Sequence, residues 1–351
     1  MPVKAIHIAT HPVGPGHPCF IIAEAGVNHD GDLTKALHLV EVAAQVGANA
    51  VKFQTFKADR VITAAAPKAS YQKVTTDAQE SQFAMLHRLE LQPDDHRTIQ
   101  QRAVELGLVF LSTPYSVEDA RFLLDLGVPA FKLASIDVVN TPLLRAIASW
   151  GKPLILSSGM ATMGEIERGI ETVRTANNEQ IILLQCTTNY PIQDDEVNLR
   201  VMHTLRQAFE VVVGFSDHTI GWEIPLAAVA LGASVIEKHF TLDRLAPGPD
   251  HAASLEPGDF ARMVQGIRRV EQALGSSQKR PLPVELENRK TMRRSLVAAI
   301  DIPAGTTITE EMLTLKRPGT GFGAEAIDLF AGRTARQNIV ASTILALEMV
   351  E

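Results

Sequence analysis

The strongest constraint on the fold is a local pattern that the sequence repeats. An amphipathic stretch ends at a glycine, and a short apolar run that finishes in polar residues follows it. Glycine accepts the left-handed backbone conformation that ends many helices, so this order indicates a helix followed by a strand. The pattern occurs at Gly47, Gly107, Gly127, Gly151 and Gly232. It predicts an α/β protein in which helices alternate with parallel strands.

The full pattern predicts eight strands. Three are the apolar runs at residues 20–24, 181–187 and 211–216, and the five after the glycines are residues 48–54, 108–113, 128–135, 152–158 and 233–239. Such strands, apolar on both faces, are typical of a parallel sheet covered by helices. The final helix has apolar residues at helical spacing, namely Phe260, Met263, Val264, Ile267, Val270 and Leu274. Eight units within residues 1–275 favour a (βα)8 TIM barrel over the alternative, an open doubly wound sheet.

The remaining segments differ in character. Residues 276–292 are rich in Ser, Lys, Pro and Glu, which predicts a linker. Residues 293–351 contain short apolar runs broken by Pro and Gly, which is typical of a small β-rich domain. The connection at residues 56–92 is unusually long for this pattern. We interpret it either as a lid over the barrel mouth or as a surface insertion with a short helix at residues 81–89.

Composition excludes several classes of function. The chain of 351 residues has a formal net charge of -7 and no block of Lys and Arg, so nucleic acid is a poor partner. No secretory signal and no apolar stretch of membrane-spanning length is evident, so we expect a soluble, cytoplasmic protein without a membrane partner. The two cysteines, Cys19 and Cys186, form neither a disulfide framework nor a zinc cluster, and we expect buried thiols.

Polar side chains stand at the end of every predicted strand. In a barrel these ends meet at one rim, where active sites of this fold lie. A single polar strand end is usually only solvated, but eight together predict a functional site. The residues are Glu24, Lys52, Gln54, Ser112, Thr113, Lys132, Ser135, Ser157, Ser158, Gly159, Thr187, Thr188, Tyr190, Ser216, Asp217, His218, Glu237, Lys238 and His239.

Two lysines at this rim indicate an anionic ligand. Lys52 and Lys132, together with the neighbouring hydroxyl groups, suit a phosphate or a carboxylate. Side chains alternate along a strand, so Glu237 and His239 share a face while Lys238 points the opposite way. We therefore expect Lys238 to lie outside the site.

A pair of histidines on neighbouring predicted strands forms a candidate metal site. His218 and His239 can reach one ion, with Glu24 and Asp250 as nearby carboxylates. Hydrogen-bonded structural histidines are at least as common, and only the position at the barrel mouth favours a metal.

Several segments of the chain have a distinctive order and spacing. They are IIAEAGVNHDG ending at residue 31, KFQ at 52–54, FKLAS at 131–135, LSSGM at 156–160, CTTNYP at 186–191, FSDHTIG at 215–221 and VIEKHFTLDRLAPGPDHAASL at 235–255, with RRSLV at 293–297 and KRPGTG at 316–321 in the tail. With these segments the sequence resembles the bacterial sialic acid synthase family over nearly its whole length, and the tail resembles the antifreeze-like (SAF) module of these enzymes.

The resemblance implies a specific reaction. Phosphoenolpyruvate would condense with N-acetylmannosamine or a related N-acetylated amino sugar, giving an N-acetylneuraminate-type nonulosonate and phosphate. It implies a divalent metal, Mn²⁺ or Mg²⁺, bound by His218 and His239, with Glu24 as a further catalytic residue. It also implies a domain-swapped homodimer in which the SAF module of one subunit completes the barrel mouth of the other.

The resemblance also implies which residues bind the substrates. Those for phosphoenolpyruvate are Lys52, Lys132, Ser135, Ser157 and Ser216, with Thr113 nearby. Those for the open-chain sugar are Glu24, Gln54, Tyr190 and Asp250, with Arg317 reaching in from the partner's module.

Position 188 departs from the family pattern. Many members that use N-acetylmannosamine have Asn there, and the Thr188 version resembles synthases of legionaminic or related acids, so legionaminate or pseudaminate synthesis is an alternative. Two further alternatives stay open. One is a Schiff-base aldolase that uses Lys132. The other is an ice- or carbohydrate-binding tail on a degenerate barrel, against which the intact polar strand ends argue.

Overall fold

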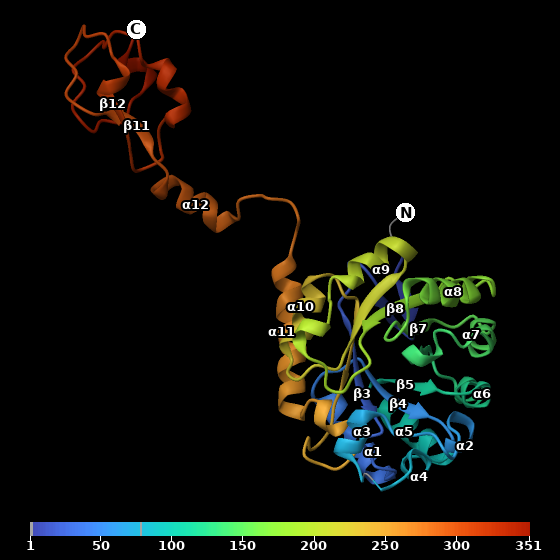
Figure 1. Ribbon diagram of the computed structural model, residues 1–351. Helices are drawn as coiled ribbons and strands as arrows, with labels where there is room; N and C mark the ends of the chain where they lie inside the picture. Colours follow the sequence, from blue (N-terminus) through green and yellow to red (C-terminus); the bar gives the residue numbers. More distant parts are fainter. Residues whose placement is uncertain (1–2, 78) are drawn as a thin grey trace. The chain divides into compact units, whose positions relative to one another are not determined.

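The computed structural model describes residues 3–77 and 79–351 of the chain. The chain divides into two compact units, Met1–Gly275 and Ser276–Glu351 (Figure 1). The larger unit contains a nearly closed barrel of parallel strands, and the smaller one a short antiparallel sheet. In the described part of the chain, no helix is both long enough and apolar enough to cross a membrane.

Each barrel strand lies beside the strands that precede and follow it in the sequence. The described strands pair in the order β5-β4-β3-β10-β9-β8-β7-β6, and β5 and β6 lie side by side at the remaining gap. The last strand, β10, pairs in parallel with the first, β3, so the alternative of an open doubly wound sheet is wrong. The eight predicted strands are all confirmed as β3 (Phe20–Gly26), β4 (Ala50–Thr55), β5 (Val109–Pro114), β6 (Phe131–Leu133), β7 (Leu154–Ser157), β8 (Ile181–Cys186), β9 (Val212–Asp217) and β10 (Val235–His239).

A long helix follows each barrel strand and packs on the outside of the ring (Figure 1). Asp32, Ser116, Asn140 and Thr162 each begin such a helix by accepting a hydrogen bond from the backbone N–H three residues later. The glycines expected to end helices all have positive φ, between 69° and 93°. The helices are α1 (Leu33–Gln45), α5 (Pro93–Glu105), α6 (Val117–Leu126), α7 (Thr141–Ala148), α8 (Met163–Arg174), α9 (Val201–Phe209), α10 (Glu223–Ala230) and α11 (Pro257–Leu274), and short 3₁₀ turns occur at η1 (Ser135–Asp137), η2 (Asp194–Glu196) and η3 (His251–Ala253).

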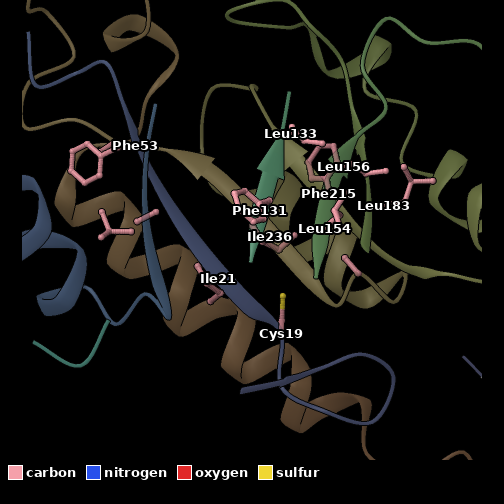
Figure 2. Close-up of a cluster of buried hydrophobic side chains, with 14 of the residues drawn as sticks. Cys19, Ile21, Phe53, Phe131, Leu133, Leu154, Leu156, Leu183, Phe215 and Ile236 are labelled. Atoms are coloured by element: carbon pink, nitrogen blue, oxygen red, sulfur yellow. The ribbon is translucent and has the colours of Figure 1, made fainter. Parts of the chain in front are cut away.

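The core of the barrel unit has two hydrophobic layers. One lies between strands and helices, and Figure 2 shows part of it, including Ile21, Phe131 and Ile236. The other fills the barrel interior. A hairpin that the sequence analysis did not predict, β1 (Ile6–Ile8) with β2 (His11–Val13), adds its apolar residues to this inner layer.

Alternation between these layers decides which strand-end residues face the barrel axis. On β10, Val235 belongs to the inner layer and Ile236 to the outer one. Glu237 and His239 therefore point inward, and Lys238 points toward the helices.

The long connection at residues 56–92 packs against the loop after β3. It carries the short helices α2 (Ala58–Val61), α3 (Ser70–Thr75) and α4 (Gln82–Arg88), and the last of these confirms the helix predicted at residues 81–89. Phe56, Met85 and Leu89 form a small hydrophobic cluster with Val27. Lys68 holds the segment together, since its Nζ donates to Thr76 Oγ1 at 3.0 Å.

The smaller unit is built around its own apolar core, which includes Leu296, Phe330 and Leu345. The segment predicted as a linker is not irregular throughout. Its second half forms α12 (Pro283–Met292), because Pro283 occupies the first helical turn and Glu285 accepts a hydrogen bond from the Leu282 N–H at 2.6 Å. The other elements are β11 (Ser295–Ala298), β12 (Leu313–Lys316) and the 3₁₀ turns η4 (Glu310–Met312), η5 (Ala324–Leu329) and η6 (Leu347–Met349).

Candidate active site

The carboxyl ends of the barrel strands line a cavity of about 560 Å³. The barrel thus brings together side chains that lie far apart in the sequence. Their chemical roles stay predictions. The predicted site residues among the lining are Glu24, Lys52, Gln54, Thr113, Lys132, Ser135, Ser157, Thr188, Tyr190, Ser216, His218, His239 and Asp250.

Arg317 lies in the smaller unit, directly after β12. Its Nε donates a hydrogen bond to the Met292 carbonyl oxygen at 3.1 Å, and its side chain is exposed. The expected contact with a sugar in a partner subunit stays a prediction.

A buried network of charges crosses the cavity floor. Lys52 Nζ lies 2.7 Å from Glu24 Oε2 and 2.9 Å from Thr113 Oγ1. Lys132 Nζ lies 3.3 Å from Glu237 Oε1, and Lys52 Nζ lies 3.8 Å from Glu237 Oε2. All of these charged groups are almost fully buried. Two ammonium groups are therefore presented to the cavity by carboxylates, an arrangement that can bind an anion.

Glu237 is a site residue to which the sequence analysis gave no role. It lies between the two lysines and accepts a hydrogen bond from Ser216 Oγ at 3.0 Å. Burial works to raise the pKa of Glu237, but the ammonium groups of Lys132 and Lys52 outweigh it and hold the pKa below its usual value. One signal for Glu237 was present in the sequence, because it lies two residues before His239 and so points the same way along the strand. Spacing along the chain did not reveal its two lysine partners.

Glu24 differs from Glu237 in its electrostatic environment. Burial raises the pKa of Glu24 to about 7, although the nearby Lys52 opposes this shift. A carboxyl group with this pKa exchanges a proton readily near neutral pH, which suits a general acid or base.

Three polar side chains converge on the backbone at Gly26. A methyl group added there would lie 3.2 Å from Asp250 Oδ2, 3.4 Å from Glu24 Oε1 and 3.5 Å from Gln54 Nε2. Burial raises the pKa of Asp250 to about 6. The absence of a side chain at Gly26 thus lets two carboxyl groups and an amide share one corner of the cavity.

The two predicted metal ligands face the same space. The ring centroids of His218 and His239 are 5.3 Å apart. His218 Nδ1 donates to the Thr187 carbonyl oxygen at 2.7 Å, which leaves the Nε2 lone pair free. Nδ1 of His239 is buried without a hydrogen-bond partner among the described residues.

The protonation of these histidines suits a metal. Burial lowers the pKa of His218 to about 4, and burial and then His218 lower that of His239 well below its usual value, so both rings are neutral at pH 7. The side chains present therefore fit a divalent ion. Within residues 3–77 and 79–351 no group of three or more His, Cys, Asp or Glu is arranged to hold a metal. An ion bound by the two imidazoles would complete its shell with water and substrate oxygens.

Hydroxyl groups line the part of the cavity formed by the loops after β6, β7 and β8. Ser135 Oγ lies 3.0 Å from Thr188 Oγ1. A side chain at Gly159 would overlap both residues. Ser157 Oγ is buried and has no hydrogen-bond partner among the described residues, so it is available to a ligand.

An apolar wall completes the cavity, and the sequence analysis did not predict it. Phe56, Val61, Met85, Leu86 and Leu89 all belong to the connection at residues 56–92, and all line the cavity. This connection is therefore part of the site, which favours the interpretation as a lid over that of a surface insertion.

Some strand-end residues lie outside the cavity. Ser112 Oγ is 2.6 Å from Thr55 Oγ1 on the neighbouring strand. Lys238 points away from the barrel axis, as expected, and is fully buried against Asp217.

Comparison with known proteins identifies the family. The profile of the NeuB family matches residues 39–279. The chain belongs to the NeuB family. The profile of the SAF domain matches residues 293–351, so the resemblance found in the sequence is confirmed over both segments.

Relatives of this NeuB-family chain are similar over nearly their full length. An N,N'-diacetyllegionaminic acid synthase of Legionella pneumophila is 44% identical, covering 97% of both chains. Another of Campylobacter jejuni is 47% identical, covering 91% of this chain and 96% of the relative. The crystal structure of an N-acetylneuraminic acid synthetase from Leptospira borgpetersenii, in complex with citrate, has a TM-score of 0.72 and 34% identity, covering 82% of this chain and 95% of that one. The NeuB-family chain is thus an enzyme of the nonulosonic acid synthase family.

Proposed function

We propose that this enzyme condenses phosphoenolpyruvate with an N-acetylated amino sugar to give a nine-carbon 2-keto acid and phosphate. The observation that carries the proposal is the cavity itself. It combines two buried ammonium groups, which suit an anionic substrate, with a pair of neutral imidazoles, which suit a cation that contacts the sugar. Phosphoenolpyruvate carries a carboxylate and a phosphate, and the open-chain sugar carries an aldehyde that a bound cation can polarise.

The reaction balances without a redox partner. C3 of phosphoenolpyruvate forms a bond to the aldehyde carbon, and the aldehyde oxygen becomes a hydroxyl. Water adds at C2, and the C–O bond to phosphate breaks, so phosphate leaves and the 2-keto group remains. Lys52, Lys132 and the free hydroxyl of Ser157 would hold the anionic groups of phosphoenolpyruvate during these steps, with Ser135, Ser216 and Thr113 close by.

A divalent metal, Mn²⁺ or Mg²⁺, would be held by His218 and His239. When bound, it would act as a Lewis acid on the sugar aldehyde. The hydrogen bond from His218 Nδ1 to Thr187 fixes the ring in the tautomer that ligation requires.

Glu24 is our candidate for proton transfer. Its carboxyl group lies on the cavity floor beside Lys52 and has a pKa of about 7. It would accept a proton from the water that adds at C2. Gln54, Asp250 and Tyr190 line the cavity and would orient the sugar hydroxyl and acetamido groups.

The lining favours a sugar that is less polar than N-acetylmannosamine. Thr188 is shorter than the Asn of many enzymes that use N-acetylmannosamine, and its hydroxyl is already paired with Ser135. The wall that includes Met85 and Leu86 can pack against methyl groups. The two relatives described above are named as N,N'-diacetyllegionaminic acid synthases. We therefore favour a 2,4-diacetamido-6-deoxy sugar over N-acetylmannosamine.

A Schiff-base aldolase is the rival activity. It needs a lysine amine that is free to attack a carbonyl carbon, but Lys132 Nζ lies 3.3 Å from the Glu237 carboxylate and is engaged in that ion pair. Borohydride in the presence of a ketone substrate should leave the enzyme unmodified.

The assembly is also a proposal. The second unit would complete the mouth of a partner's barrel in a domain-swapped homodimer and bring Arg317 to the sugar. We place the reaction in the cytoplasm, where phosphoenolpyruvate is made.

The test is an assay of purified protein with phosphoenolpyruvate and a panel of N-acetylated amino sugars. Phosphate should be released only when a sugar is present, in equal amount to a nine-carbon 2-keto acid. No sugar-dependent phosphate with any member of the panel would contradict the proposal.

A further inference from the structure

A fully buried ion pair lies just outside the cavity, between the ends of β9 and β10. Lys238 Nζ is 2.6 Å from Asp217 Oδ2, and both side chains have 0% relative exposure. Both side chains point toward the surrounding helices, away from the barrel axis. Neither residue can contact a substrate in the cavity.

The pair lies directly next to both candidate metal ligands. Asp217 precedes His218, and Lys238 precedes His239 in the sequence. Lys238 and Asp217 are also register partners in the parallel ladder of β10 and β9. The ion pair therefore joins the two strand ends at the level where their histidines enter the cavity.

The same pair also fixes the turn that carries His218. Asp217 Oδ1 accepts a hydrogen bond from the Thr219 N–H at 2.9 Å. Lys238 Nζ donates to the Thr219 carbonyl oxygen at 2.6 Å. Both hydrogen bonds hold the backbone of Thr219, directly after His218, and the His218 carbonyl oxygen itself accepts from the Ile192 N–H at 3.1 Å.

A buried ion pair of this kind usually adds little to the stability of the fold. Removing two charges from water is costly, and replacing such a pair by apolar side chains of similar size is often neutral or stabilising. The surroundings would accept an apolar replacement, because Ile236 and Phe240 on either side of Lys238 belong to the hydrophobic layer. The ion pair instead fixes the orientation of both side chains, because the ammonium and carboxylate groups must stay in contact.

We propose that the Lys238–Asp217 pair is a positioning clamp that sets the distance between the His218 and His239 rings for one shared divalent cation. The inference rests on the proposed function, which assigns these histidines to the metal. Lys238 and Asp217 are positioning residues, because they act through their neighbours. Groups that bond directly to a metal ligand and orient it typically change metal affinity about 10- to 100-fold when they are removed, and this range sets the scale of the effect expected here.

The test compares Mn²⁺ affinity of full-length proteins, measured without substrates by the electron paramagnetic resonance signal of free Mn²⁺. The main variant is Asp217→Asn/Lys238→Met, which removes the ion pair without leaving a buried charge. Asn can still accept from the Thr219 N–H, and Met fills the volume of the lysine stem. We expect about 10- to 100-fold weaker Mn²⁺ binding, with a cooperative unfolding transition retained. The single variant Lys238→Met should also weaken Mn²⁺ binding. It should in addition destabilise the fold, because the buried Asp217 carboxylate is left without its cationic partner.

The control removes a partly exposed ion pair that also holds backbone at the other end of the barrel. Arg268 Nη1 donates to the Cys19 carbonyl oxygen at 3.0 Å and also pairs with Glu271. Arg268→Met should lower the melting temperature and leave Mn²⁺ affinity unchanged. Equal Mn²⁺ affinity of the wild type and the double variant would overturn the positioning clamp but leave the metal site in place. Failure of the wild type to bind Mn²⁺ overturns the metal site in the proposed function, and the clamp with it.

Discussion

Lys52 Nζ lies 2.7 Å from the carboxylate of Glu24, at the floor of a cavity where both groups are nearly excluded from solvent. The Lys52 ammonium group lowers the pKa of the Glu24 carboxyl group and burial raises it, and burial has the larger effect. Glu24 is thus poised near neutral pH beside the group expected to hold the anionic substrate.

The first prediction concerns Glu24 and pH. If this carboxylate takes a proton from the attacking water, kcat should rise as the pH increases through about 7, because the protonated form is inactive. Glu24→Gln should lower kcat by roughly 10²- to 10⁴-fold and abolish this pH dependence. The measurement is kcat between pH 5.5 and 8.5. An unchanged pH profile in the variant would assign the titration to another group.

The second prediction concerns the metal. A chelator should abolish activity, and Mn²⁺ or Mg²⁺ should restore it. His218→Ala and His239→Ala should each raise the metal concentration needed for half-maximal activity at least tenfold, because each removes one of two protein ligands. Full activity of both variants in the presence of chelator would refute the metal site.

The third prediction concerns Arg317 and the swapped dimer. Arg317→Ala and deletion of residues 293–351 should each cripple condensation and leave the barrel folded, as circular dichroism would show. Mixing Arg317→Ala with His239→Ala should restore some activity, because one mouth in each heterodimer combines an intact barrel with an intact module. No recovery after demonstrated subunit exchange would contradict the swapped arrangement.

The fourth prediction concerns the sugar. Thr188→Asn should shift the ratio of kcat/KM for N-acetylmannosamine and for 2,4-diacetamido-6-deoxymannose by roughly three- to tenfold toward N-acetylmannosamine. This shift corresponds to one neutral hydrogen bond of about 0.5–1.5 kcal/mol. A wild type that strongly prefers N-acetylmannosamine, with a ratio unaffected by the substitution, would show that position 188 does not select the sugar.

The fifth prediction concerns stability in acid. His29 is buried, and its Nδ1 accepts a hydrogen bond from the Gly31 N–H at 3.0 Å, while burial lowers its pKa to about 4. In the unfolded chain the pKa is about 6.5. The neutral ring therefore stabilises the fold above pH 6.5, and this contribution is lost as the pH falls toward 4.

The variant His29→Asn isolates that contribution, because the Asn oxygen can accept from Gly31 and does not titrate. Between pH 7 and pH 5 the wild type should lose about 2 kcal/mol more free energy of unfolding than the variant. Urea unfolding at both pH values measures the difference. Equal losses would show that the His29 ring becomes protonated without cost to the fold.

The sequence by itself determined the barrel and the polar residues that stand at its rim. Glycines such as Gly127, which ends α6 at φ 84°, and the alternation of side chains along strands are local signals. They can be detected without knowing which segments meet in space. The same alternation correctly separated Lys238 from its neighbour His239, because the direction of a side chain follows from its position along the strand.

Only the tertiary structure decided how these residues pair. The contacts of Glu237 with Lys52 and Lys132 join three strands, and that of Lys238 with Asp217 joins two. The apolar wall arises from the packing of residues 56–92 over the barrel mouth. Such contacts depend on barrel closure and loop packing, which bring distant segments within a few ångströms. No spacing along the chain encodes these distances, so the sequence located the residues of the site but not their partners.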